Sequence, residues 1–309
     1  MIFRIDHTSF CNWDNNQIPI LLWSLVRHHH LIDCEDSRVR EEIKECFKGN
    51  MDVNLMCRKL FEITDEQRQF FTTINVSQYK FDQLLLLAGE RSRILIENGP
   101  YEWPIYESLS LAYKKDPEYG NIFNYIKQAI DTHDLVCLHG GGITTFDALI
   151  ELEEKTCYPG SIFALKHVVV FDRDTSAGNE YDPNRNILFN KFCEKESNAV
   201  GDNDVYTLNQ TPYIWHVWYK RAIENYFSND RYEQQHVDTR KLPREQNNRD
   251  YCKIGDYLGN VKKVMKSIAK GMTMGEFESH LHKFRVKIND EERELSEFQL
   301  LLLKIARII

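Results

Sequence analysis

VVVFDRDTSA (residues 168–177) places four apolar residues in front of two aspartates that flank an arginine. The apolar run predicts a buried strand. Residues i and i+2 of a strand share a face, so Asp172 and Asp174 would be neighbours if the strand continued through them. Two like charges so close cost free energy unless something positive lies between them. A divalent-metal site would explain the arrangement, and so would a phosphotransfer site with an aspartate nucleophile.

Other short apolar runs surround this strand from about residue 91 onward. RILIENG (93–99) predicts a strand that ends at Glu97, DLVCLHGGG (134–142) a strand that enters a glycine turn, and NDVYTLN (203–209) a further strand. Strands that alternate with helices predict an α/β fold with a mainly parallel, Rossmann-like sheet flanked by helices. The predicted helices are PIYESLSLAYKK (104–115), TTFDALIELEEK (144–155), NILFNKFCEKE (186–196) and WYKRAIENYF (218–227).

The chain divides into three predicted regions. Residues 1–90 show helical spacing of apolar residues and no clear sheet pattern, which predicts a mostly helical N-terminal module. Residues 91–230 form the predicted α/β core. Residues 231–309 are predicted to hold the rest of a polar loop at 228–251 and then a helical region.

Composition limits the classes of function. The 309 residues are 42% hydrophobic and 28% charged, as in globular proteins, and the formal net charge of -8 argues against coating nucleic acid by bulk electrostatics. No stretch has the length and apolarity of a membrane span, and the N-terminus lacks a signal-peptide pattern. The eight cysteines include no CxxC pair. These features predict a cytoplasmic protein with no membrane association and with buried thiols.

Acidic residues and glycines follow three consecutive predicted strands. Ligands of open parallel sheets bind beyond the carboxyl ends of the strands, where Glu97, Gly140–Gly142, Asp172 and Asp174 are expected to meet. One explanation is a haloacid dehalogenase-like phosphatase, because FDRDT (171–175) matches its DxDxT motif, with Asp172 as nucleophile. GDND (201–204) resembles the later acidic motif of that family, but it precedes a predicted strand instead of following one, and Glu97 has no role there.

The order of the parts resembles a Toprim domain, the metal-binding catalytic module of topoisomerases, primases and the OLD (overcoming lysogenisation defect) family nucleases. RILIENGPYEW resembles its opening strand and acids, and LHGGGITTFDAL its glycine turn. VVVFDRD resembles its DxD strand, and YKRAIENYF the segment after its fourth strand. The order and spacing of these segments most resemble those of the OLD-like effectors of bacterial anti-phage defence.

This resemblance implies a metal-dependent nuclease that cuts DNA or RNA with Mg²⁺ or Mn²⁺. Hard oxygen ligands suit both ions, and clustered carboxylates supply them. The implied ligands are Glu97, Glu102, Asp172, Asp174 and Glu224; ENGPYE carries one residue more than the family pattern between its two acids. Arg173 lies on the opposite face of a strand, so a structural role is expected for it.

A catalytic lysine is also implied by the OLD-type resemblance. Lys220 is one candidate, and VKKVMKSIAKG places Lys262, Lys266 and Lys270 on one helical face as others, although such faces are usually just solvated. Unlike full-length OLD proteins, the chain has no GxxxxGK[ST] loop, so a separate ATPase or regulatory protein is an expected partner. A non-catalytic Toprim binding module within a larger assembly is the alternative from another class.

A second metal site is suggested by His28, His29, His30 and Cys34. Zinc sites pair ligands at short separations in two clusters, and no second cluster lies near these residues in the sequence. The favoured expectation for them is therefore structural.

Overall fold

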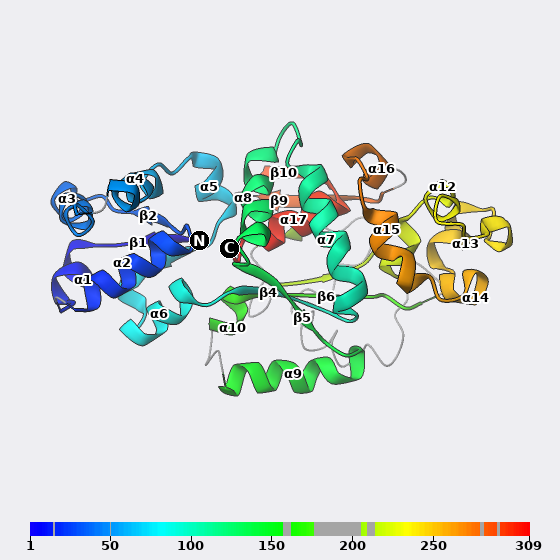
Figure 1. The fold of residues 1–309 in the computed structure, drawn as a ribbon, viewed down its shortest axis with the longest axis horizontal. Coiled ribbons are helices and arrows are strands. Elements are labelled where there is room, and N and C mark those ends of the chain that lie inside the picture. Colours follow the sequence, from blue (N-terminus) through cyan, green and yellow to red (C-terminus); the bar gives the residue numbers. More distant parts are fainter. Residues whose placement is uncertain are drawn as a thin grey trace.

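The computed structural model describes residues 1–14, 16–49, 51–156, 162–175, 205–208, 214–278, 281–288 and 291–309. Figure 1 shows an elongated molecule, with the N-terminal region at one end, a parallel sheet in the middle and residues 229–258 at the other end. Both chain termini lie near the middle, where the amino group of Met1 donates a hydrogen bond to the carbonyl of Ile309.

The central sheet confirms the predicted α/β class with parallel strands. Its order is β5-β4-β6-β8, and all three pairings are parallel. Leu95 of β4 is opposite Val169 of β6, and Val169 is opposite Trp215 of β8. The strands are β4 (Ser92–Ile96), β5 (Leu135–His139), β6 (His167–Phe171) and β8 (Ile214–Val217).

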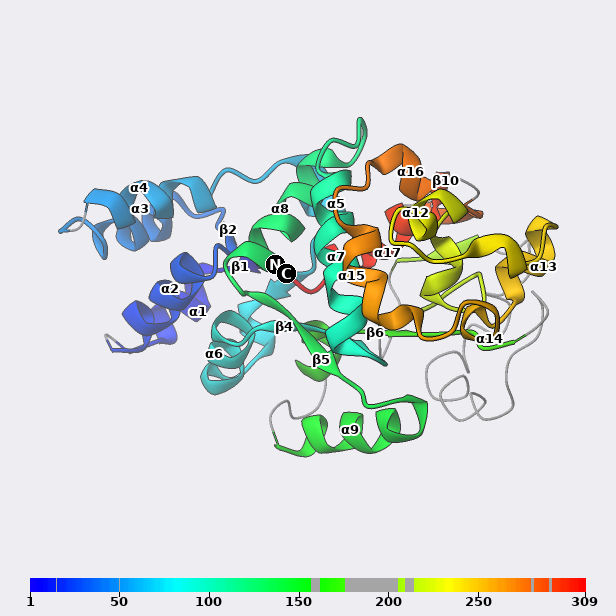
Figure 2. The same ribbon diagram turned by 45° about the vertical axis from the view of Figure 1, so that its right-hand side comes forward.

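Helices cover both faces of this sheet (Figures 1 and 2). Alternate residues of β4 serve the two faces: Ile94 and Ile96 belong to one core, and Leu95 belongs to the other with Phe146. A strand buried on both faces needs apolar residues at every position, which explains the continuous runs in the sequence. One face carries α7 (Gly99–Tyr113), α8 (Gly120–Asp131) and α17 (Glu297–Ala306), and the other carries α9 (Ile143–Thr156) and α10 (Ile162–Lys166).

The fourth strand of the sheet was predicted in the wrong place. NDVYTLN contributes β7 (Val205–Thr207), which pairs with β9 (Lys283–Ile288) in a separate sheet. The strand beside β6 is β8, whose buried Trp215 and His216 occupy both faces. The predicted helix at 186–196 and GDND at 201–204 lie outside the described residues.

The N-terminal region is mostly helical as predicted, but it also contains a sheet that the sequence did not reveal. Three parallel strands of three residues each run in the order β2-β1-β3. The elements are β1 (Ile2–Arg4), α1 (His7–Asn12), α2 (Gln17–Arg27), β2 (Leu31–Asp33), α3 (Ser37–Glu45), α4 (Met51–Leu60), α5 (Asp65–Phe70), β3 (Thr73–Asn75), the 3-10 helix η1 (Val76–Gln78) and α6 (Phe81–Gly89).

Residues 218–309 depart from their predictions in three ways. Residues 218–227 hold only a short 3-10 helix, η3, and the expected polar loop holds short helices. The expected helical end also contains an antiparallel pair, β9 with β10 (Glu291–Ser296). The remaining elements are η3 (Ile223–Tyr226), α12 (Asn229–Glu233), η4 (Thr239–Lys241), α13 (Gln246–Tyr251), α14 (Ile254–Leu258), η5 (Val261–Val264), α15 (Met265–Ala269) and α16 (Met274–Glu278).

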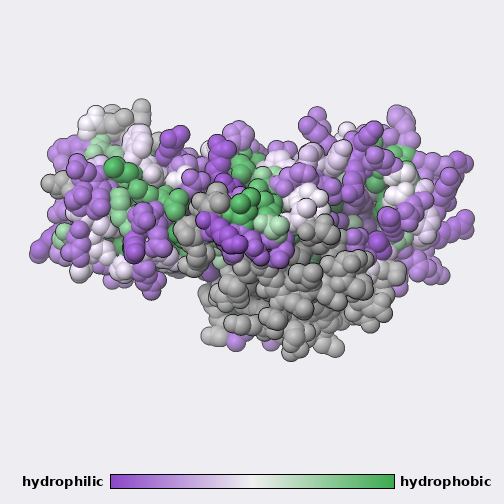
Figure 3. Space-filling model, turned by 90° about the horizontal axis from the view of Figure 1, so that it is seen from below, coloured by the Kyte–Doolittle hydropathy of each residue, from purple (hydrophilic) through white to green (hydrophobic). Residues whose placement is uncertain are grey.

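The described part of the face seen from below is mainly hydrophilic and carries small, separate groups of hydrophobic residues (Figure 3). Within the described ranges, no helix combines the length and the apolarity that a membrane span requires.

Candidate functional site: a carboxylate pocket

Two carboxylates meet where β4 and β6 end. Glu97 follows the last residue of β4, and Asp172 follows the last residue of β6. Because the two strands are adjacent and parallel, both side chains emerge at the same edge of the sheet. The backbone N–H of Asp172 donates a hydrogen bond to Oε1 of Glu97 across 3.3 Å. Glu97 is buried, with 8% of its surface exposed.

A tight turn after β4 is fixed by Glu102, which lies in the first turn of the next helix, α7. Asn98 and Gly99 lead directly into α7, and Pro100 fits the first turn, where the missing N–H costs nothing. The N–H of Asn98 donates to Oε1 of Glu102 across 3.0 Å. A Cβ on Gly99 would lie 2.7 Å from Sγ of Cys137, so a glycine allows α7 to start this close to β5.

The second glycine turn is also a packing device. Gly140 follows β5, and its N–H donates to the carbonyl of Ile96, which ties the end of β5 to the end of β4. A Cβ on Gly140 would lie 1.8 Å from the ring of Phe146, and Gly141 and Gly142 have positive φ angles of 70° and 104°. These glycines therefore serve a tight strand-to-helix turn.

Asp174 reaches the site by a turn and not by continuation of the strand. β6 ends at Phe171, and Asp174 has a left-handed φ of 58°. Its N–H donates to the carbonyl of Arg221 across 2.9 Å, and its Oδ1 lies 3.5 Å from Nη2 of Arg221. The premise that Asp172 and Asp174 share a strand face is wrong, but both line the same pocket.

Arg173, between them, is buried, although β6 ends before it and the expected opposite strand face does not exist. It is 2% exposed, and its Nε donates to the carbonyl of Trp218 across 3.1 Å. Its guanidinium lies 5.3 Å from the centre of the Tyr219 ring.

Glu224 comes from η3, on the segment that follows β8. Its Oε2 is enclosed and has no hydrogen-bond partner among the described residues. An enclosed carboxylate oxygen without a donor is costly, so it calls for a proton or a cation. The hydroxyl of Tyr232 donates to the Glu224 carbonyl across 2.8 Å and fixes the backbone there.

The pocket that these residues line has a volume of about 340 Å³. Three sides of its wall come from distant parts of the chain: the sheet edge, η3 and the residues around α14 and η5. Three positively charged side chains face the carboxylates. The lining residues are Glu97, Asp172, Asp174, Arg221, Ala222, Glu224, Asn225, Lys253, Ile254, Gly255, Gly259, Asn260, Val261 and Lys262.

The carboxylates perturb one another. Burial raises the pKa of Glu102 to about 8, and the charges of Glu224 and Glu97 contribute to the rise. Burial, followed by the charge of Glu97, raises the pKa of Asp172 well above its ordinary value. Burial also raises the pKa of Glu224, although the nearby Lys262 ammonium opposes the rise. Each of these groups thus favours a proton until positive charge enters the pocket.

Of the four lysines considered, the structure brings only Lys262 to the pocket. Residues 261–270 form η5 and then α15, and Lys266 and Lys270 are exposed outside the pocket lining. Lys220 is buried and lies 2.8 Å from Oδ1 of Asp250, above the ring of Tyr226. It lines a neighbouring pocket instead.

Two basic residues of the site were missed by sequence reasoning. Arg221 stands inside the YKRAIENYF motif, next to the lysine that drew attention. Lys253 lies more than 20 positions beyond the motif, and nothing in the local sequence links it to the sheet edge.

The donor set suits a hard divalent cation, since carboxylate oxygens predominate and one of them lacks a partner. The side chains are not drawn together into a ready coordination shell. Among the described residues, no group of three or more His, Cys, Asp or Glu side chains is arranged to hold a metal ion. Ligation by these residues would require the carboxylates to close on the ion.

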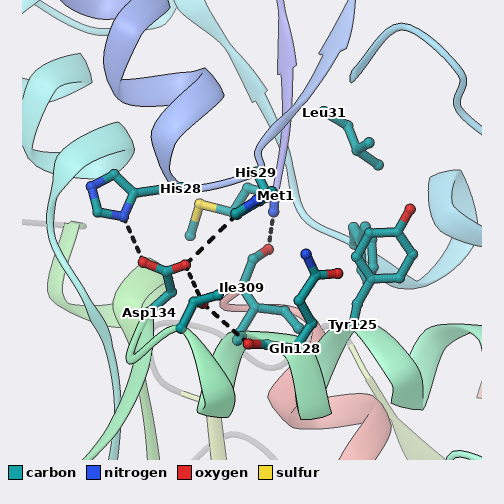
Figure 4. A pocket seen from close by; sticks show the side chains of 11 residues that line it. Met1, His28, His29, Leu31, Tyr125, Gln128, Asp134 and Ile309 are labelled. Atoms are coloured by element: carbon teal, nitrogen blue, oxygen red, sulfur yellow. Dashed lines mark hydrogen bonds and ion pairs between the residues drawn. The ribbon is translucent and has the colours of Figure 1, made fainter. Parts of the chain in front are cut away.

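The histidines lie at a different place: His28 and His29 line a small cavity between the N-terminal region and α8 (Figure 4). Nδ1 of His28 lies 2.6 Å from Oδ1 of Asp134, and Nδ1 of His29 lies 4.0 Å from Oδ2 of the same residue. His30 is buried beside Phe3. Cys34 donates to the carbonyl of Asp36, so it does not join the histidines.

Family models, curated protein sequences and solved structures were compared with this chain, and none of the three comparisons found a match.

Proposed function

We propose that this chain is a Mg²⁺- or Mn²⁺-dependent nuclease of the Toprim type, related in design to the OLD family. The observation that carries the proposal is the meeting of Glu97, Asp172, Asp174 and Glu224 in one pocket, from three separate segments. The enclosed, unpartnered Oε2 of Glu224 supports it, because that atom is satisfied by a cation or a proton. Arg221, Lys253 and Lys262 line the same pocket, and their positive charge supports an anionic substrate.

The four pocket carboxylates would hold the cation. When bound, a divalent ion polarises a phosphodiester and makes a nearby water a stronger nucleophile. Arg221 and Lys262 line the same pocket and offer positive charge to phosphate oxygens. Arg221 also orients Asp174 through its carbonyl and its guanidinium.

Glu102 has a positioning role in this proposal. It is 5% exposed and does not line the pocket. Its carboxyl accepts the N–H of Asn98, the residue after Glu97, and so fixes the turn that carries Glu97.

The test is nucleic-acid cleavage by the purified full chain. Plasmid DNA, single-stranded DNA and tRNA are incubated with Mg²⁺, Mn²⁺ or EDTA, using Asp172→Asn as the site variant. Asp238→Asn is the matched control, because Asp238 is surface-exposed and pairs only locally with Arg240. We expect metal-dependent cleavage by the wild type and the control alone. Equal cleavage by Asp172→Asn would reject the assigned site.

A haloacid dehalogenase-like phosphatase remains the second candidate for Asp172 and Asp174. It predicts hydrolysis of small phosphomonoesters and a covalent aspartyl phosphate on Asp172. Rapid acid quench with ³²P-labelled phosphomonoester, followed by peptide mapping, detects that intermediate. Label on Asp172 without nucleic-acid cleavage would replace the nuclease proposal.

A non-catalytic Toprim module is distinguished by binding. It predicts retention of nucleic acid in Mg²⁺ without cleavage products, even at high protein concentration. The intact set of acids argues against it, since binding a phosphate backbone gains nothing from clustered negative charge.

A role in anti-phage defence under control of a separate ATPase extends the proposal. It rests on the OLD-like order of motifs. Affinity purification from infected and uninfected cells, followed by an ATPase assay of the co-purified protein, tests it. Cleavage at full rate by the isolated chain would remove the need for such control.

A further inference from the structure

A second pocket lies directly beside the carboxylate pocket. It has a volume of about 230 Å³, and Asn225 lines both cavities. Asn225 is held firmly, because its Nδ2 donates to the carbonyls of Arg249 at 2.8 Å and Cys252 at 2.9 Å. The other lining residues are Lys220, Tyr226, Phe227, Ser228, Asn229, Pro243, Arg244, Gln246, Arg249 and Glu276.

Arg249 gives this pocket a buried positive charge. The residue is 7% exposed, and its Nη2 donates to the carbonyl of Phe227 across 3.0 Å. Its Nη1 is enclosed and has no hydrogen-bond partner among the described residues. A buried guanidinium with an unused donor is costly unless an anion completes its hydrogen bonds.

The remaining charges leave the pocket positive. Lys220 is paired with Asp250, and Glu276 on the rim is paired with Arg231. In the part of the chain that the structure describes, no carboxylate pairs with Arg244 or Arg249. Arg244 is exposed, so it can meet a ligand at the mouth while Arg249 lies deeper.

We propose that this basic pocket, lined by Lys220, Arg244 and Arg249, binds a phosphate group of the substrate strand that is not the one being cut. The inference rests on the proposed nuclease function and adds a second contact to it. The planar guanidinium fork matches phosphate oxygens, and Asn225 sets the pocket next to the carboxylates. The phosphate is either an internal phosphodiester or a monoester at a strand end.

Inorganic phosphate is the first probe, because its binding does not depend on cleavage. Calorimetric titration of the full chain with phosphate, against chloride at equal ionic strength, measures the affinity. We expect Arg244→Gln and Arg249→Gln each to weaken phosphate binding roughly tenfold or more. Arg240→Gln is the matched control, since Arg240 is exposed, pairs with Asp238 and lines neither pocket. Circular dichroism checks that each variant folds.

Oligonucleotides then identify the source of the phosphate. Strands with a 5′-phosphate, a 3′-phosphate or hydroxyl ends are bound in Ca²⁺ at several salt concentrations. Arg244→Gln should lower the salt slope by about 1, and Arg240→Gln should not. An effect confined to one phosphorylated end assigns a terminal phosphate; an equal effect on all strands assigns an internal one.

The proposal fails if the wild type does not bind phosphate, or if Arg244→Gln and Arg249→Gln bind it as the control does. Its failure is separable from that of the nuclease proposal. Phosphate binding that needs Arg244, in a chain that cuts no nucleic acid with any metal, would keep the pocket and reject the nuclease. Nucleic-acid cleavage by the wild type, with phosphate binding unaltered in both variants, would keep the nuclease proposal and reject the phosphate pocket.

Discussion

The backbone N–H of Asp172 donates to the side chain of Glu97, 75 positions earlier in the chain. This bond joins the ends of two adjacent parallel strands and brings two negative side chains together. The two carboxylates still disfavour each other, because the pKa of Asp172 is raised well above its ordinary value, first by burial and then by the charge of Glu97. The relationship makes Glu97 the position at which charge and hydrogen bonding can be separated by mutation.

Glu97→Gln keeps the side-chain carbonyl that accepts the Asp172 N–H but removes one charge from the pocket. We expect loss of metal affinity and of cleavage by more than about 100-fold, since even outer-shell changes cost about 10–100-fold. Without metal, the melting temperature should rise, because like-charge repulsion falls. Mn²⁺ titration calorimetry and thermal melts measure the two effects. A lower melting temperature with unaltered Mn²⁺ affinity would contradict this assignment.

Metal-free stability should depend on pH through Glu102. Its pKa rises from the ordinary 4.5 to about 8 in the folded protein, so the folded state holds a proton that the unfolded chain releases. Stability is therefore greatest below pH 4.5 as far as this group is concerned, and it falls as pH rises towards 8. Melts from pH 5 to 8.5 should show the fall in EDTA, and Mg²⁺ should protect most at high pH.

Glu102→Gln is the control for that pH dependence. The amide cannot titrate, so the fall in EDTA should flatten while the Asn98 hydrogen bond remains available. An unchanged pH profile would place the titrating group elsewhere.

Gly140→Ala should destabilise the protein by about 1–3 kcal/mol, because its methyl group would overlap the Phe146 ring. Gly275→Ala, in the short helix α16, meets nothing within 4 Å and should be neutral or stabilising by up to about 1 kcal/mol. Urea denaturation measures both free energies of unfolding. Equal effects would show that the turn after β5 can shift away from Phe146.

Lys262 and Lys220 should respond to substitution in different ways. Lys262→Gln should lower cleavage with little change in stability, because Lys262 lines the carboxylate pocket. Lys220→Met should lower the free energy of unfolding by about 3–5 kcal/mol, because the substitution leaves the carboxylate of Asp250 without its ion-pair partner. The double variant Lys220→Met with Asp250→Asn should recover much of that loss. Denaturant titration and initial cleavage rates separate the two lysines.

The sequence was informative wherever strands are buried on both faces. RILI, LVCL and HVVVF contain apolar runs long enough to predict β4, β5 and β6, and the acids that follow them then share a sheet edge. For this reason Glu97, Asp172 and Asp174 could be predicted to lie near one another. Glu224 was identified from motif resemblance, since no local pattern marks η3 as part of a site.

The sequence was uninformative where pairing depends on distant residues. The three-residue strands β1, β2 and β3 are too short to show a period. In β9, charged residues alternate with Phe284, Val286 and Ile288, a strand pattern that the predicted helical end overlooked. Lys253 and Lys262 reach the pocket only because residues 253–262 fold back over the sheet edge. Contacts of that kind are decided by the tertiary structure and leave no local signal.

Every residue of α17 except Gln299 is buried, and the helix packs on α7, α8 and β8. Its Glu297 accepts the N–H of Tyr219 at 2.7 Å, and its Lys304 donates to the carbonyl of Trp215 at 2.8 Å. During synthesis, the face of the central sheet that α7 and α8 share with α17 therefore stays incompletely covered until residue 306 has left the ribosome. A nascent chain with such a face exposed is prone to aggregate, so folding in the cell should be sensitive to chaperone supply and to pauses late in translation.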